Sequence, residues 1–298
     1  MPYLKKSIFA LPFLLFFLLF CLNLDLFLQN SNFLFSFDLQ EIFQLMLLVF
    51  YLLLSSGFFT ILITLAMDWK IILPTALLTS LIPFFFITSS AYLLILGFFI
   101  SFLITFFFLQ KRLKNYLTFQ ASPLLMPSIK FLSTLIILVS SLVFYLNISQ
   151  SLAKNGFQIP DSLLDPIINM TTSNLPTANL PQGPGPMASI SADQIELLKQ
   201  YGLDPKILDQ FTTTQTSGTP QNSFIKSAIS SQINNLIGPN LGIVAIVLAI
   251  TFFVSLNFLS SFLALFIYPI ISGVFWFLEK TGFTKFEITQ REVKKLVI

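Results

Sequence analysis

Long apolar runs alternate with short polar segments along this chain. Five runs carry almost no charge, at residues 7–28, 41–67, 71–110, 131–148 and 241–278. A helix needs about 20 apolar residues to cross a hydrocarbon core of roughly 30 Å, and each run approaches or exceeds that length. The pattern predicts an all-α polytopic membrane protein.

The run at residues 71–110 is too long for a single crossing. As one helix it would measure about 60 Å, twice the thickness of the hydrocarbon core. We therefore expect it to fold back at the polar cluster Thr88-Ser89-Ser90 and to form two helices. The short Asp68-Trp69-Lys70 segment before it is expected to be a turn, with Trp69 at the level of the lipid headgroups.

The run at residues 241–278 is also long, at about 57 Å as one helix. We expect one crossing near residues 241–263, then a break around Pro269 and Gly273 and an interfacial or re-entrant segment. Two crossings would put the basic tail outside the cell, against the tendency of Lys and Arg to stay in the cytoplasm. The chain is thus predicted to have about six transmembrane helices.

The Lys and Arg residues fall at the ends of the apolar runs. With Lys5 and Lys6 in the cytoplasm, twelve basic residues lie on that side and four lie outside, all four within residues 149–240. Long loops of this kind cross the membrane largely regardless of charge. This arrangement predicts an inner or plasma membrane protein with both termini in the cytoplasm.

Four regions follow from these boundaries. They are a bundle of five helices at 1–148, an extracytoplasmic insertion at 149–240, the sixth helix with its interfacial segment at 241–278 and a basic cytoplasmic tail at 279–298. The expected cytoplasmic loop before helix five contains Pro123 and Pro127.

The insertion is expected to be largely disordered and partly helical. Residues 171–189 and 212–222 are rich in Thr, Ser, Asn, Pro and Gly and cannot bury enough apolar surface to offset chain entropy. Between them, residues 191–211 have the capping pattern of a small helical hairpin.

Residues 222–237 predict an amphipathic helix, because apolar side chains recur there every three or four positions. This face is a candidate surface for a partner or for the outer leaflet, or else it covers the hydrophobic rim of the protein's own bundle. Its candidate interaction residues are Phe224, Ile225, Ile229, Ile233 and Leu236.

Several kinds of chemistry have no residues to support them. The chain has no His, which excludes hydrolase mechanisms that depend on imidazole. No phosphate-binding, dinucleotide-binding or calcium-binding motif occurs, and the acidic residues lie near predicted interfaces or in the insertion. The basic residues are scattered at segment ends, which argues against nucleic acid as a partner. We expect no enzyme, no metal site and no cofactor.

Polar side chains do occur inside the predicted helices. They either line a path for a substrate or form hydrogen bonds that hold the helices together. These candidate intramembrane contacts are Ser55, Ser56, Thr79, Ser80, Ser140, Ser141 and Asn257.

Two functions fit this sequence. The first is a non-enzymatic membrane protein whose external insertion anchors or docks another envelope protein. The alternative is a small permease, or a membrane subunit of a transporter, that uses the Ser- and Thr-lined helices.

Overall fold

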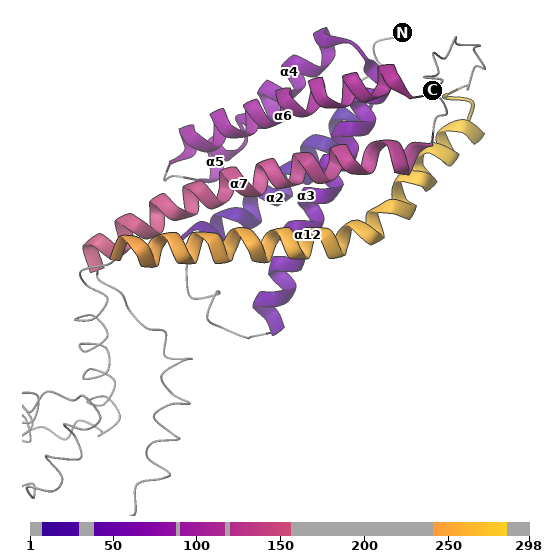
Figure 1. Ribbon diagram of the computed structural model, residues 1–298. Coiled ribbons are helices and arrows are strands. Elements are labelled where there is room, and N and C mark those ends of the chain that lie inside the picture. Colours follow the sequence, from indigo (N-terminus) through magenta and orange to yellow (C-terminus); the bar gives the residue numbers. More distant parts are fainter. Residues whose placement is uncertain (1–7, 30–38, 88–89, 117–119, 156–240, 285–298) are drawn as a thin grey trace, which may run out of the picture. The chain divides into compact units, whose positions relative to one another are not determined.

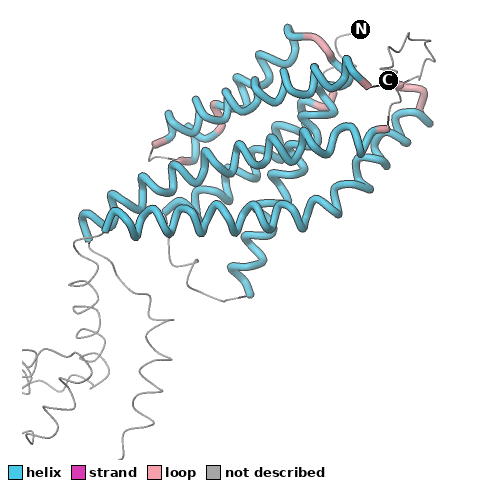
Figure 2. The backbone as a smooth tube through the Cα atoms, viewed as in Figure 1, coloured by secondary structure: helices cyan, strands magenta, loops and turns pink. Residues whose placement is uncertain are grey.

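The computed structural model describes residues 8–29, 39–87, 90–116, 120–155 and 241–284 (Figure 1). These residues are almost entirely helical and include no strand, as Figure 2 shows. The helices are α2 (Ala10–Gln29), α3 (Leu39–Ala66), α4 (Trp69–Ser80), α5 (Pro83–Phe86), α6 (Ala91–Asn115), α7 (Ala121–Asn155) and α12 (Leu241–Lys280).

Within the described ranges, six helical segments are long and apolar enough to cross a membrane when α4 and α5 are taken together as one span. The prediction of an all-α polytopic membrane protein with about six transmembrane helices is therefore confirmed.

The chain divides into two compact units. The first contains residues 1–28, 42–143 and 252–298, and the second contains residues 29–41 and 144–251. In the described part of the second unit lie the first residues of α3, the end of α7 and the start of α12. All contacts between helices described below are within the first unit.

A cluster of Phe side chains joins α2, α3 and α6 in the core of the first unit. Phe13 and Phe17 of α2, Phe59 of α3 and Phe98 and Phe102 of α6 are all fully buried. The ring centroids of Phe13 and Phe59 lie 4.9 Å apart, those of Phe17 and Phe98 5.4 Å apart and those of Phe59 and Phe102 5.0 Å apart. These separations are those of favourable aromatic pairs, so the rings hold the three helices together.

The break predicted at Asp68-Trp69-Lys70 lies one position earlier, at Met67 and Asp68, and Trp69 and Lys70 already belong to α4. Met67 adopts a left-handed conformation with φ of 46°, which ends α3. The carboxylate of Asp68 then caps α4 by accepting a hydrogen bond from the backbone N–H of Lys70 at 3.1 Å. The Trp69 ring packs in tilted geometry against Phe106 and Phe107 of α6, with ring centroids 5.3 Å and 5.9 Å away.

The run at residues 71–110 folds back on itself, as its length predicts. α5 ends at Phe86, α6 begins at Ala91, and both α4 and α5 pack against α6. The first of these two spans is interrupted, because α4 ends at Ser80 and α5 begins at Pro83. The proline has no backbone N–H to continue the α-helical pattern, and the N–H of Ile82 instead donates to the carbonyl of Thr79 at 3.1 Å.

Helix α7 is longer than the sequence predicts. We expected helix five at residues 131–148 after a cytoplasmic loop, but α7 runs from Ala121 to Asn155. Pro123 lies in the first turn, where backbone N–H groups have no helical acceptor, so proline costs little there. Pro127 lies inside the helix. The region read as loop is thus the beginning of α7, and residues 149–155 continue the helix instead of opening the insertion.

Helix α12 is continuous over 40 residues, and the expected break around Pro269 and Gly273 is absent. Figure 1 shows α12 changing direction in its C-terminal part, which contains Pro269. A helix can bend at proline without ending, provided that its neighbours compensate for the lost hydrogen bond. A continuous helix cannot fold back, so α12 crosses the membrane once at most.

The predictions for the insertion lie outside the described residues. They are the flexible segments 171–189 and 212–222, the helical hairpin at 191–211 and the amphipathic helix at 222–237 with Phe224, Ile225, Ile229, Ile233 and Leu236.

Candidate functional site

Polar side chains link α7 and α12 along one seam. The hydrogen bonds pair residues 122, 133 and 134 of α7 with residues 268, 260 and 257 of α12, in that order. The two helices are therefore antiparallel. We call this line of contacts the α7–α12 seam; it contains Ser122, Ser133 and Thr134 of α7 and Asn257, Ser260, Tyr268 and Ser272 of α12.

The middle of the seam contains two hydrogen-bonded pairs. The hydroxyl of Thr134 donates to Oδ1 of Asn257 at 3.2 Å. The hydroxyls of Ser133 and Ser260 lie 3.3 Å apart, and Ser133 also donates to the carbonyl of Lys130 at 2.9 Å. Since Ser133 has one proton, Ser260 is then the donor to Ser133. Asn257 was predicted as an intramembrane contact, and its partner is a side chain on another helix.

A third connection lies near the bend in α12. Ser122 donates to the backbone carbonyl of Tyr268 at 2.9 Å, and its oxygen lies 2.6 Å from the hydroxyl oxygen of Ser272. Sequence reasoning missed Ser122 because it placed this residue in a loop. A usable signal was the spacing of Ser122 and Ser133, because eleven residues make about three helical turns and return to the same face.

Four of the predicted polar residues bond only within their own helices. Thr79 donates to the carbonyl of Thr75 and Ser80 to that of Leu77, both at 2.8 Å. In α7, Ser140 donates to Ile136 and Ser141 to Ile137, at 2.9 Å and 2.8 Å. Such bonds satisfy a hydroxyl in an apolar environment without a partner helix or a water-filled path.

The remaining two predicted residues, Ser55 and Ser56 of α3, are each 1% exposed. Neither hydroxyl has a hydrogen-bond partner. The next residue, Gly57, faces α12, since a Cβ built on it would lie 3.8 Å from Cδ1 of Ile271. Gly57 therefore marks a place where α3 has no side-chain bulk beside α12.

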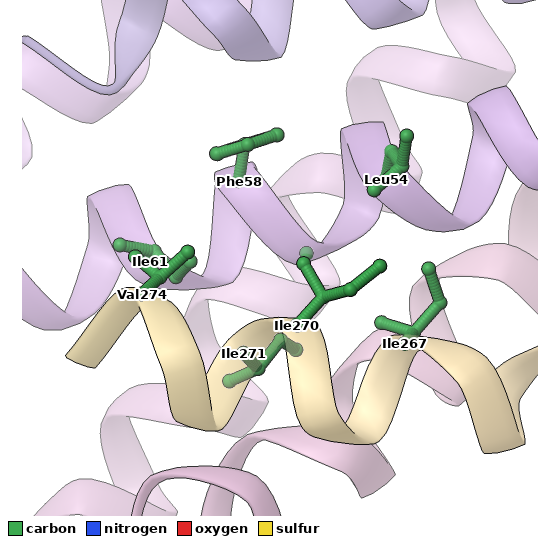
Figure 3. A pocket seen from close by; sticks show the side chains of 8 residues that line it. Leu54, Phe58, Ile61, Ile267, Ile270, Ile271 and Val274 are labelled. Atoms are coloured by element: carbon green, nitrogen blue, oxygen red, sulfur yellow. The ribbon is translucent and has the colours of Figure 1, made fainter. Parts of the chain in front are cut away.

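The space between α3 and α12 at this point is apolar. A cavity of about 10 Å³ is lined by Leu54, Gly57, Phe58, Ile61, Ile267, Ile270, Ile271 and Val274, and Figure 3 shows these aliphatic and aromatic side chains along the two helices. Holding a single water takes about 10–15 Å³ and polar partners. At about 10 Å³ and with no polar side chain in its lining, this space is too small and too apolar to hold more than a single water.

No cluster of three or more His, Cys, Asp or Glu side chains suited to a metal ion occurs among the described residues. Cys21, the only cysteine in the chain, is fully buried in α2.

Comparison with protein-family models, with curated proteins and with solved structures found no match.

Proposed function

We propose that the protein is a non-enzymatic membrane anchor that presents residues 156–240 to another envelope protein. The supporting observation is the α7–α12 seam, because α7 and α12 are the helices that flank this segment. At 1.5 Å per residue they measure about 52 Å and 60 Å, well beyond a hydrocarbon core of roughly 30 Å. Two long helices joined by side-chain hydrogen bonds would anchor both ends of residues 156–240 to the membrane.

The transporter alternative has less support. It requires a continuous polar cavity between the helices, whereas Thr79, Ser80, Ser140 and Ser141 donate to the backbone of their own helices. The cavity between α3 and α12 is small and apolar.

The same proposal includes the orientation of the chain in an inner or plasma membrane. In the first unit, the ends of α3, α6 and α12 and the starts of α4 and α7 lie together at one end (Figure 1). Basic residues cluster in these segments, which favours this end as the cytoplasmic one. They are Lys70, Lys111, Arg112, Lys114, Lys130 and Lys280.

Deleting Thr171–Gln221 tests the anchoring role. We expect partner proteins that crosslink to the unmodified protein in intact cells to be lost from the deletion variant. A control variant with residues 171–221 in scrambled order should show the same loss while its own level in the membrane stays normal. An unchanged set of crosslinked proteins in the deletion variant would refute the docking proposal.

A matched pair of substitutions tests whether residues 222–237, within the presented segment 156–240, dock through an apolar face. Ile229→Lys places a charge on the apolar face predicted from the sequence, and Ser230→Lys places the same charge on the polar face. Ile229→Lys is expected to abolish partner crosslinking and Ser230→Lys to preserve it. Equal behaviour of the two variants would mean that residues 222–237 do not dock through an apolar face.

A further inference from the structure

A groove lies between α7 and α12, beside the part of the seam formed by Ser122 and Tyr268. Its volume is about 370 Å³, and its lining residues are Met126, Lys130, Ala264, Leu265 and Tyr268. The side chains of Leu265 and Tyr268 are 70% and 47% exposed, and Lys130 is also exposed. Both helices are membrane spans, so a groove exposed on their surface is open to lipid.

The groove combines apolar walls with one cation. Met126, Ala264 and Leu265 offer hydrocarbon surface, whereas Lys130 brings an ammonium group and Tyr268 a phenol. Among the described residues, no Asp or Glu lines the groove and no ion pair joins a carboxylate to the ammonium of Lys130. A lone ammonium beside lipid favours a negatively charged partner.

The depth of the groove matches the headgroup level. Lys130 is the last charged residue before the apolar stretch 131–148 of α7, and Tyr268 suits the aromatic belt at the edge of the hydrocarbon core. From Leu241 to Tyr268, α12 rises about 40 Å, enough to cross the core and reach the interface.

Pro269 also leaves one backbone carbonyl of α12, beside the groove residues, without its usual helical donor. Pro269 has no N–H, so the carbonyl of Leu265, four residues earlier, loses its usual helical donor. Leu265 lines the groove.

We infer that the groove binds one anionic phospholipid. Its phosphate pairs with the ammonium of Lys130, its headgroup lies beside Tyr268, and an acyl chain lies along Met126, Ala264 and Leu265. A soluble phosphate ion would meet a single ammonium and three apolar side chains, so the lining suits a ligand that is itself amphipathic. This lipid would contact both helices of the seam and stabilise their association.

Native mass spectrometry of the full chain in neutral detergent tests this site. Titration with phosphatidylglycerol and, separately, with phosphatidylcholine is expected to show tighter binding of the first phosphatidylglycerol molecule. Lys130→Gln should weaken that binding about five-fold, the effect of one Lys at an anionic membrane surface. Lys130→Arg should retain it, because the cation is kept.

Lys70→Gln is the matched control, since Lys70 is exposed at the same end of the first unit but does not line the groove. It is expected to bind phosphatidylglycerol as the unmodified protein does. Equal weakening in Lys70→Gln and Lys130→Gln would overturn the site in favour of general surface charge. If excess inorganic phosphate displaces the lipid, the groove is a soluble-anion site instead. If the protein forms a dimer without lipid, and Lys130→Gln abolishes that dimer, the groove binds a second copy of the chain.

Discussion

At Gly97, the absence of a side chain allows α6 to approach α7 closely. A Cβ built on this glycine would collide with the methyl groups of Val139. Val139 is β-branched and stiff at χ1, so it cannot swing aside easily. By contrast, the α12 glycines Gly242 and Gly273 have no heavy atom within 4 Å of a built Cβ. The close contact with Val139 therefore requires glycine at position 97, whereas no such contact requires it at positions 242 and 273.

This difference predicts the outcome of substitutions at Gly97. Gly97→Leu should destabilise the protein by about 1–3 kcal/mol because it overpacks the contact with α7. Gly273→Ala should be neutral or stabilise by about 0.5–1 kcal/mol, since alanine favours helix over glycine. Thermal unfolding in detergent measures both changes.

Val139 provides the internal check on that result. Val139→Ala makes room at the contact, so the combined Gly97→Ala and Val139→Ala variant should be more stable than the sum of the two single changes predicts. Strict additivity would show that the two residues do not meet in the folded protein.

At the scale of the helices, the α7–α12 seam shows how single polar side chains specify pairing and register. Lipid is as apolar as Leu or Ile, so burial of apolar surface gives little preference for one helix neighbour over another. A hydrogen bond between Thr134 and Asn257 forms only when α7 and α12 meet in the observed register. The apolar side chains supply close packing, and the polar pairs select which faces meet.

A double-mutant cycle between Thr134 and Asn257 measures this contribution. Thr134→Val and Asn257→Leu should show a coupling energy of about 0.6 kcal/mol, the average for such pairs in membrane proteins. Combining Asn257→Leu with Ser140→Ala is the control, because Ser140 bonds only within α7 and its effect should add. Zero coupling in the first cycle would remove Thr134 and Asn257 as a pair that stabilises the seam.

Much of the helix arrangement was predictable from the sequence. The number of spans follows from run length, and the reversals at Met67-Asp68 and before Ala91 follow from short polar breaks in apolar sequence. Proline was the source of two of the errors, at the start of α7 and within α12; the extension of α7 over residues 149–155 has no proline behind it. Proline ends many helices in water, but it is tolerated in the first turn of a helix. Inside a membrane, breaking the helix at proline would leave more backbone groups without hydrogen-bond partners than bending it does.

The seam was only partly predictable. Asn257 was singled out, but a hydroxyl that bonds its own helix, such as Ser140, has the same sequence signature as one that bonds a neighbour, such as Ser133. The choice between them depends on which face of the helix meets another helix. That is a property of tertiary packing, and local periodicity in an almost uniformly apolar helix carries little information about it.

At the scale of the whole molecule, cysteine labelling tests the topology. The single native cysteine is removed as Cys21→Ala, because its side chain is fully buried and alanine avoids placing a hydroxyl there. A membrane-impermeant thiol reagent should then label cysteines at Asn30, Thr177 and Thr216 in intact cells. Cysteines at Asn115 and Thr289 should react only after permeabilisation.

Position 289 is the most informative of the five. It follows α12, and a single crossing of that helix puts it on the same side as Asn115 at the end of α6. Labelling at 289 in intact cells would contradict the proposed cytoplasmic C-terminus. Labelling at 115 in intact cells would invert the whole arrangement.

The hairpin formed by α4, α5 and α6 has a consequence for biogenesis. No charged residue occurs between Lys70 and Lys111, so the entire hairpin can leave the translocation channel for the bilayer without carrying a charge across the core, a step that costs about 2.5–3.5 kcal/mol per charged residue at mid-membrane. The span interrupted at Leu81 and Ile82 is the weaker partner, because its broken backbone pattern needs α6 alongside. The two spans are thus suited to enter the membrane together as one paired unit, in which α6 stabilises the interrupted span that is synthesised before it.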